Sequence, residues 1–433
     1  MIWSDIFCLK NSLWYERYFA FLVTALPIFL LTTKGWGSSV GILIFLSAIY
    51  GVFALNCICG ESESTKGRRW GLLLTAPLIV ESLVSALRYV VNGDAPHLPS
   101  YDNAGRYLIG ACFLFFALRS IKIYLYRPLA IGCGIGLLFL IVNFLIFPEY
   151  FWGGDYARAA TAILDPNTVG VFSVGLAALA YFAFASTDIK VLSWILRPLI
   201  LCLAFWGSLG TESRSAMLAM FAFYSIVIIY ETKGALYWRF ILFLLFPLGI
   251  FYSWQFGFAV YRIDDYVRDI FLYFQHGTAH PSSIGLRIEL WTLDWLLLKA
   301  HPILGIKDGA LPSMDMLRDA SGIMFTPEVY EQKILSGSHT EYMAWLVKQG
   351  IFGFISLVSI FFAPLIFFLK RACLATSRDD YVSWAGLSFI LVVMAGGVGI
   401  QVLNMKLAST FFSLSLAVLI SDSIKRQSES AAS

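Results

Sequence analysis

Long apolar stretches separated by short polar connections run along almost the whole chain. A transmembrane helix needs about 20 predominantly apolar residues. The pattern therefore predicts an all-α integral membrane protein with about twelve transmembrane helices, of which the fourth and the last are the shortest. Their approximate ranges are 18–33, 38–58, 70–91, 105–120, 128–147, 168–185, 191–209, 215–231, 237–257, 340–370, 382–400 and 406–421.

The composition supports this prediction and excludes a soluble globular protein. Charged residues make up only 14% of the chain, hydrophobic residues 59%, and the mean hydropathy is +0.75. A soluble domain carries about 25% charged residues. The net charge of +3 says little about partners, and we expect membrane lipids rather than a nucleic acid around this protein.

The distribution of Lys and Arg predicts the orientation. The first 17 residues lack the pattern of a cleaved signal peptide, so we place the N-terminus in the cytoplasm. The inside connections then hold 17 of the 31 Lys and Arg, as the positive-inside rule requires, and an even number of spans returns the C-terminus to the cytoplasm. The short outside connections and their helix ends hold six: Lys34, Arg88, Arg106, Arg158, Arg214 and Lys406.

The longest polar stretch divides the chain into three parts. Residues 1–257 form a membrane bundle of about nine spans, and 340–433 hold the last three spans and a cytoplasmic tail. Residues 258–339 are predicted to be one large loop on the outer side, which is the periplasm in a Gram-negative cell. This loop would sit at one surface of the bilayer and carry the chemistry.

The loop itself contains helical patterns. Apolar residues recur three and four apart in 261–274, which predicts an amphipathic helix on the membrane surface or against the bundle. A second amphipathic helix is predicted over 287–302, and 305–322 reads as loop with a short helix. The next helix opens with Ser338 or Thr340 as its N-cap. The predicted apolar side of 287–302 consists of Ile288, Trp291, Trp295 and Leu298.

Two arginines on the outer side are candidates for binding phosphate. Arg214 lies where 191–209 ends and 215–231 begins, and Arg287 begins the predicted helix 287–302. A guanidinium makes bidentate hydrogen bonds to phosphate oxygens and stays charged at any relevant pH. Together they could clamp a diphosphate. The alternatives are an anchoring charge for Arg214 and a solvated helix face for Arg287.

His339 is the candidate for proton transfer. Of the five His, it is the one at the start of a predicted helix, beside Glu341 and Tyr342 and ahead of a long apolar run. An unperturbed imidazole titrates at about pH 6.5 and can therefore accept a proton near neutrality. A capping or interface histidine is the alternative.

A further pair of charged residues lies inside the span 70–91. Glu81 and Arg88 are seven residues apart and share a helix face. A carboxylate within a membrane is a candidate functional group, and a structural ion pair with another helix is an equal alternative. We assign Glu81 no role.

Other kinds of site find little support in the sequence. It has no Walker loop, no dinucleotide fingerprint and no His/Asp metal cluster, so we predict neither cofactor nor metal. Asp264 and Asp265 are a weak metal candidate. Asp165, Pro166 and Asn167 read as helix capping and turn chemistry.

The polar region resembles a known family. The segment from Arg287 to Trp291, then 301–309 and 338–353, resembles the signature region of the O-antigen ligase and polymerase superfamily. Two spacings resemble the ligase branch: Arg214-x3-Leu218 and His339-x10-Gly350. The predicted topology also matches, so the resemblance covers essentially the whole chain. The chain departs from the superfamily at Thr340, where Asn is frequent.

The resemblance implies a GT-C-like glycosyltransferase at the outer face of the bacterial inner membrane. The donor would be an O-antigen polysaccharide linked to undecaprenyl diphosphate, and the acceptor a sugar hydroxyl of the lipid A core. The reaction would invert the anomeric carbon and use neither metal nor nucleotide. Arg214 and Arg287 would hold the diphosphate, His339 would activate the acceptor hydroxyl, and Arg88 would be a third phosphate contact.

Three other functions stay open. A polymerase of the same superfamily would use the same residues with another acceptor. A protein O-oligosaccharyltransferase usually carries a larger C-terminal region outside the cytoplasm. A transporter of anions or lipid-linked sugars should place polar groups near the midplane in paired halves, whereas Arg214, Arg287 and His339 all map to the outer side.

Overall fold

The structure of the protein is a computed structural model, and the part of the chain that it describes contains fourteen helices. It describes residues 13–30, 36–55, 65–92, 98–146, 165–185, 190–232, 268, 271–272, 275, 283–306, 311–321, 325, 327–374 and 380–432. Across this part of the chain the regular structure is entirely helical. This agrees with the all-α prediction and with the requirement that backbone groups in lipid bond within their own segment.

The helices follow the apolar stretches closely. Those of the membrane bundle are α2 Trp14–Leu30, α3 Trp36–Leu55, α4 Thr65–Asn92, α5 Leu98–Ser120, α6 Tyr126–Ile146, α7 Pro166–Ala185, α8 Lys190–Gly210, α9 Arg214–Glu231, α15 Glu341–Leu374, α16 Tyr381–Gly397 and α17 Lys406–Ala432. The others are α12 Ser283–Ala300, α13 Met314–Ser321 and α14 Pro327–Ser336.

Eleven of the twelve predicted spans therefore coincide with helices, and the span 237–257 lies outside the described residues. Six of the helices are long and apolar enough to cross a membrane: α4, α7, α8, α9, α15 and α17. This is consistent with an integral membrane protein, while the number of twelve remains a prediction. The last span was predicted over only 406–421, whereas the helix that begins there, α17, continues to Ala432.

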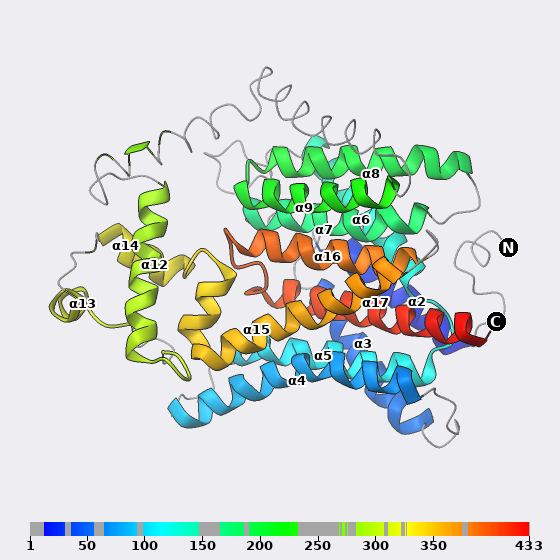
Figure 1. The fold of residues 1–433 in the computed structure, drawn as a ribbon, viewed down its shortest axis with the longest axis horizontal. Coiled ribbons are helices and arrows are strands. Elements are labelled where there is room, and N and C mark those ends of the chain that lie inside the picture. The colour runs from blue at the N-terminus through cyan, green and yellow to red at the C-terminus, as the bar shows by residue number, and fades with distance from the viewer. Residues whose placement is uncertain are drawn as a thin grey trace.

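The helices differ in how deeply the bundle buries them. α7 and α17 are almost wholly buried, whereas most residues of the α4 and α8 spans are not fully buried. In Figure 1, α16 and α17 lie between a layer containing α6 to α9 and a layer containing α3 to α5. Central helices contact protein on all sides, and the exposed apolar faces of α4 and α8 are suited to contact lipid.

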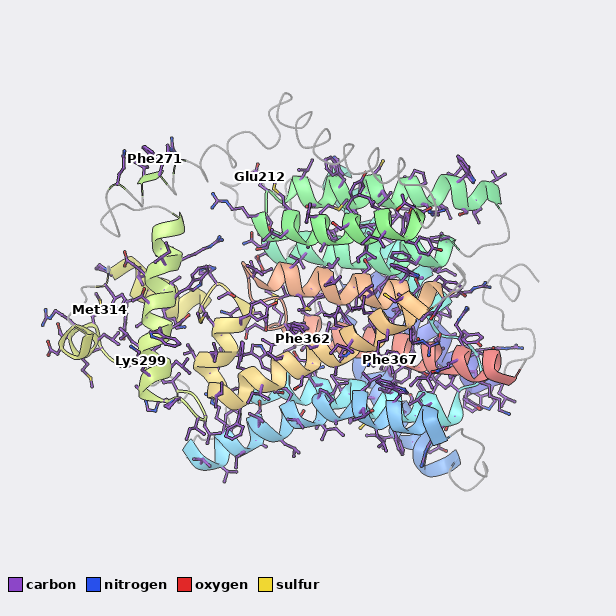
Figure 2. All side chains as sticks on the ribbon, in the orientation of Figure 1. Glu212, Phe271, Lys299, Met314, Phe362 and Phe367 are labelled. Atoms are coloured by element: carbon purple, nitrogen blue, oxygen red, sulfur yellow. The ribbon has the colours of Figure 1, made fainter. Side chains whose placement is uncertain are left out.

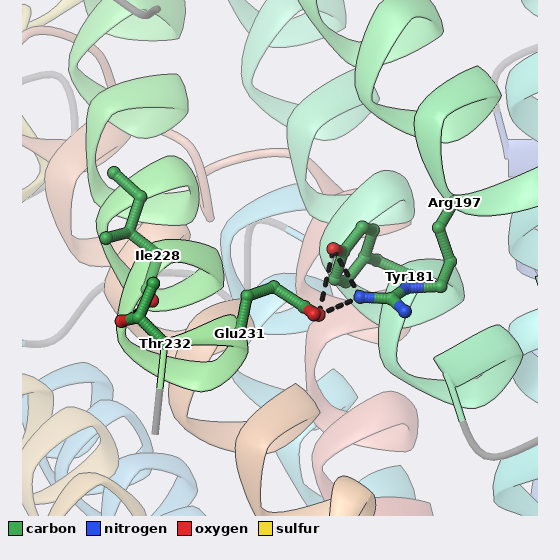
Figure 3. A network of polar contacts seen from close by, with 5 residues as sticks. All are labelled: Tyr181, Arg197, Ile228, Glu231 and Thr232. Carbon is green, nitrogen blue, oxygen red and sulfur yellow. Dashed lines mark hydrogen bonds and ion pairs between the residues drawn. The ribbon is translucent and has the colours of Figure 1, made fainter. Parts of the chain in front are cut away.

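One end of the bundle is closed by polar contacts between predicted cytoplasmic segments. Arg197 of α8 contacts Glu231 at the end of α9, and its Nη2 donates to the Tyr181 hydroxyl of α7 at 2.9 Å (Figure 3). At the same end, the Tyr126 amide of α6 donates to Asp422 of α17 at 2.6 Å. These contacts agree with the predicted alternation of helix direction.

The helices of the predicted outer loop gather at the opposite end. α12, α13 and α14 lie beyond the ends of α4, α9, α15 and α16, away from the last turns of α17 (Figure 1). They share a small apolar cluster that includes Leu290, Leu317 and Val329. The short helix predicted within 305–322 is confirmed as α13, whereas α14 was not predicted. Residues 261–274 lie largely outside the described part of the chain.

The predicted apolar side of α12 is wrong. Its buried side is formed by Leu290, Leu293 and Leu297, which are 0%, 0% and 3% exposed, whereas Trp295 is 51% exposed. Both sides of this helix are apolar, so periodicity alone could not decide between them. The leucine side is buried because it packs on α13, α14 and Val347 of α15.

Helix α15, predicted as one continuous span from 340 to 370, is broken at Gly350. This residue has φ of 64° and ψ of −157°, a combination open essentially to glycine alone. The segment after α12 docks into the break: the Ile306 amide donates to Val347 O and the Ile351 amide to Pro302 O, both at 2.8 Å. The break therefore fixes the connection between α12 and the membrane bundle.

We expect Gly350→Ala to destabilise the protein by at least about 1–3 kcal/mol, the usual cost of a strained backbone conformation. A Cβ at this position would lie 2.3 Å from the Ile303 carbonyl oxygen, so the docked segment would have to move. Thermal unfolding in nanodiscs measures the change. Gly105→Ala is the matched control, because a Cβ there meets nothing within 4 Å. Equal melting temperatures for the two variants would contradict this account of the break.

Candidate active site

His339 lies in a strained turn between α14 and α15. Its φ is 51°, a left-handed value that is uncommon for a residue with a side chain, and Gly337 just before it has φ of 75°. Thr340 immediately precedes α15, as one of the two predicted caps, and its hydroxyl donates to Gly397 O at 3.2 Å. A strained backbone held by neighbouring bonds often marks a functional position.

The surroundings of His339 favour its neutral form. Burial lowers the pKa of the imidazole from 6.5, and the positive charges of Arg287 and Lys333 lower it further. The carboxylate of Asp165 opposes this shift. A neutral imidazole near pH 7 has a free nitrogen lone pair and can therefore act as a proton acceptor.

The charge of Arg287 acts on the His339 imidazole. Lys333 also joins the helix of Arg287 to the turn of His339, because it contacts Asp294 of α12 and donates to Ser338 Oγ. Arg287 lies in the first turns of α12 and is half-buried. His339 comes from the turn before α15, more than fifty positions later in the chain. The break at Gly350 and the docked segment place α12 beside this turn.

Arg214 is the first residue of α9, at the same end of the bundle. Ser213 caps the helix by accepting from the Ala216 amide at 3.3 Å. The preceding Glu212 has φ of 49° and lies at the end of α9 that faces α12 (Figure 2). An anion placed here would meet the positive end of a helix dipole as well as the Arg214 guanidinium.

The connection between α16 and α17 links the Arg214 region to the His339 turn. A side chain at Gly399 has no room, because its Cβ would lie 2.4 Å from Ser215 Oγ. Gly337 is equally confined, because a Cβ added there would lie 2.4 Å from Gln401 Nε2. The start of α9 and the turn before α15 thus pack on the same short connection.

Arg88 is placed differently from the other three. Its side chain is only 4% exposed, and its Nη2 donates to the Ile306 carbonyl at 2.9 Å. It therefore helps to hold the segment that docks into the break of α15. A structural role, holding this docked segment in place, is therefore an alternative to the phosphate contact predicted for Arg88.

Glu81 makes contacts with neutral groups among the described residues. Its Oε1 accepts from Gln349 Nε2 at 2.9 Å and from Ser85 Oγ at 3.2 Å. Gln349 directly precedes the broken position, so Glu81 joins α4 to the break. Neither of these contacts is the ion pair that was considered as an alternative for Glu81.

Three charged residues near His339 were not predicted as part of the site. Asp165 caps α7 as expected, accepting from the Asn167 amide at 2.9 Å, but it also acts on His339. Asp294 and Lys333 form a buried ion pair. Lys333 lies between residues 322 and 338, where the sequence predicted neither a helix nor a role. The sequence did carry one signal for this pair: Asp294 is a charged residue within the apolar stretch LWTLDWLLL.

Groups of three or more His, Cys, Asp or Glu that could hold a metal ion do not occur among the described residues. Asp264 and Asp265, the weak candidate from the sequence, lie outside them.

Residues 199–358 match the protein family described as O-antigen ligase. The chain carries an O-antigen ligase family region. The resemblance predicted from the sequence is thereby confirmed for this region. This region runs from α8 into α15 and contains Arg214, Arg287 and His339, whereas Arg88 lies outside it. No curated protein matches the chain.

The O-antigen ligase region implies a membrane glycosyltransferase-like activity on a lipid-linked polysaccharide. The break at Gly350 and the docked segment 302–306 both lie inside it. The region therefore includes the connection that places α12 beside the His339 turn, as well as the three residues themselves.

Proposed function

We propose that this protein is an O-antigen ligase of the bacterial inner membrane. It transfers a polysaccharide from undecaprenyl diphosphate to a sugar hydroxyl of the lipid A core, at the periplasmic face. The observation that carries the proposal is that Lys333 joins the turn of His339 to the helix of Arg287, within a family region that also contributes Arg214 from the same end of the bundle. A base and two cations are the groups that such a transfer needs.

The reaction follows from these side chains. The neutral imidazole of His339 accepts the proton of the acceptor hydroxyl, and the oxygen attacks the anomeric carbon of the donor sugar. The bond between that carbon and the diphosphate oxygen breaks, and inversion results from attack opposite the leaving group. The leaving undecaprenyl diphosphate gains negative charge, which Arg214 and Arg287 stabilise. Neither metal nor nucleotide takes part.

Both substrates are lipids, which suits a site at the end of the bundle. The donor enters from the bilayer beside the membrane helices, and its diphosphate lies at the surface. The aromatic share of 16% suits interface anchoring and sugar stacking. Trp295, exposed on α12, is one such surface ring.

The test is complementation of a strain that lacks the gene, followed by electrophoresis of its lipopolysaccharide. Without the gene, we expect lipopolysaccharide that lacks O-antigen, with full-length polymer accumulating on the lipid carrier, and restoration by the wild-type gene. A single repeat unit on the core would instead identify a polymerase. Uptake by reconstituted vesicles without glycosyl transfer would identify a transporter.

A further inference from the structure

A buried ion pair contacts the turn that contains His339. Lys333 of α14 contacts Asp294 of α12, and the two side chains are 9% and 0% exposed. The same ammonium donates to Ser338 Oγ at 2.7 Å. Ser338 is itself 1% exposed and directly precedes His339. One cation therefore bonds at once to the helix of Arg287 and to the turn of His339.

This pair is costly as a structural device alone. Desolvating two charges takes several kcal/mol per ion in general, and well-packed apolar residues often serve stability as well or better. Burial raises the pKa of Asp294, and the ammonium of Lys333 opposes this rise. The pair lies on the same two helices as the apolar cluster of Leu290, Leu293 and Val329. The charged pair thus calls for an explanation beyond packing.

The bonds of Lys333 act where the backbone needs support. Gly337 and His339 both have positive φ, and Ser338 lies between them. The hydrogen bond to Ser338 fixes this turn, while the bond to Asp294 ties it to α12. Asp294 lies seven residues after Arg287, two helical turns along the same face. Both ends of the network therefore lead to predicted site residues.

We propose that Lys333, Asp294 and Ser338 are positioning residues, which fix the imidazole of His339 relative to the guanidinium of Arg287 during glycosyl transfer. This proposal rests on the proposed function. The three residues do not touch substrate. They act by holding the proton acceptor and the diphosphate contact at one separation, and a shift of about 1 Å in such a geometry can cost roughly a hundredfold in rate.

Lys333 also contributes a charge. The charged groups that act on His339 are Arg287 from α12, Lys333 from α14 and Asp165 before α7. Lys333 lowers the pKa of the imidazole, so its removal raises that pKa. The neutral form would then be lost at a higher pH, and the acid limb of the pH–rate profile would move upward.

The experiment compares single and paired replacements in nanodiscs, with an undecaprenyl-diphosphate-linked glycan as donor and lipid A core as acceptor. Lys333→Met leaves the Asp294 carboxylate buried without its cation and should lower both stability and rate. Asp294→Leu with Lys333→Met removes both charges and should recover the melting temperature. We expect its kcat to stay roughly tenfold to a hundredfold low, with the acid limb moved to higher pH.

Ser338→Ala keeps both charges and removes the hydroxyl, which bonds to Lys333 and also to Asp294. It should lower kcat with little change in melting temperature or in the acid limb. Lys333→Arg, which keeps the charge and can bond to both partners, should recover part of the rate. Glu231→Gln, which breaks the ion pair with Arg197 at the other end of the bundle (Figure 3), is the matched control and should leave rate and pH profile unchanged.

A stable double variant with the wild-type rate and pH profile would overturn the positioning proposal and leave the proposed function intact. If the double variant does not fold, Ser338→Ala tests the positioning proposal instead. A wild-type kcat for Ser338→Ala would overturn that proposal and leave the proposed function intact. A wild-type protein that transfers no glycan would overturn the proposed function, and the positioning proposal with it.

Discussion

Replacing His339 by alanine is expected to lower the rate of glycosyl transfer by a factor of about 10² to 10⁴, the usual contribution of a general base. The variant lacks the group that takes the proton of the acceptor hydroxyl, while Arg214 and Arg287 still hold the donor. Initial rates with purified protein in nanodiscs measure the loss. The effect should fall on kcat, with the KM for the donor little changed.

The pH dependence gives this prediction a second readout. Because burial and the cations around it lower the pKa of His339 from 6.5, the neutral imidazole is present above that lowered pKa. The wild-type rate should be at its plateau near pH 7 and fall as the pH decreases through the lowered value. In His339→Ala the residual rate should lose this acid limb.

His301→Ala provides the matched control for this experiment. His301 is an exposed histidine at the end of α12, and its backbone amide donates to Leu297 O at 3.0 Å. Its replacement should change neither kcat nor the acid limb. A His339→Ala protein that is correctly folded and transfers glycan at the wild-type rate would remove the base from the proposed mechanism.

Much of the fold follows from hydrophobic length alone. A helix in lipid must satisfy every backbone group internally, so an apolar stretch of sufficient length has essentially one solution. This is why predicted spans such as 168–185 and 191–209 coincide with α7 and α8 to within a few residues. The distribution of basic residues likewise predicts which helix ends share a side, as the contacts of Arg197 illustrate.

The outer part of the chain was harder to predict for physical reasons. α12 is apolar on two sides, and only its partners decide which side is buried. The break in α15 depends on a docked segment more than forty positions earlier in the sequence, which local propensity at Gly350 cannot reveal. Lys333 and Asp294 are far apart in the chain, so their pairing is a property of the tertiary structure.

The candidate site was predicted in part. Chemistry pointed to His339, Arg214 and Arg287. The structure joins the turn of His339 to the helix of Arg287, and Arg214 begins α9 at the same end of the bundle, where Figure 2 labels Glu212. Arg88 has the right charge and the predicted side, but its burial and its bond to Ile306 could not be read from the sequence. The charge of a residue and the predicted side of the membrane therefore indicate where a site lies, whereas the role of each residue depends on its contacts.

Replacing Arg287 or Arg214 by alanine is expected to lower kcat by a factor of about 10² to 10³ each, the usual cost of losing one donor to a developing negative charge. Lysine at either position should recover only part of the rate, since it keeps the charge but cannot make the bidentate contact. Arg318→Ala is the matched control, because Arg318 lies on α13 and pairs with the exposed Asp315. Its rate should stay at the wild-type value.

The double variant Arg214→Ala with Arg287→Ala tests whether the two arginines act on one diphosphate. Groups that stabilise the same charge lose their effects together, so the double loss should be smaller than the product of the two single losses. A multiplicative loss would mean that the two act on separate groups. If either variant raised only the KM for the donor, that arginine would serve donor capture alone, because stabilisation of the leaving group must appear in kcat.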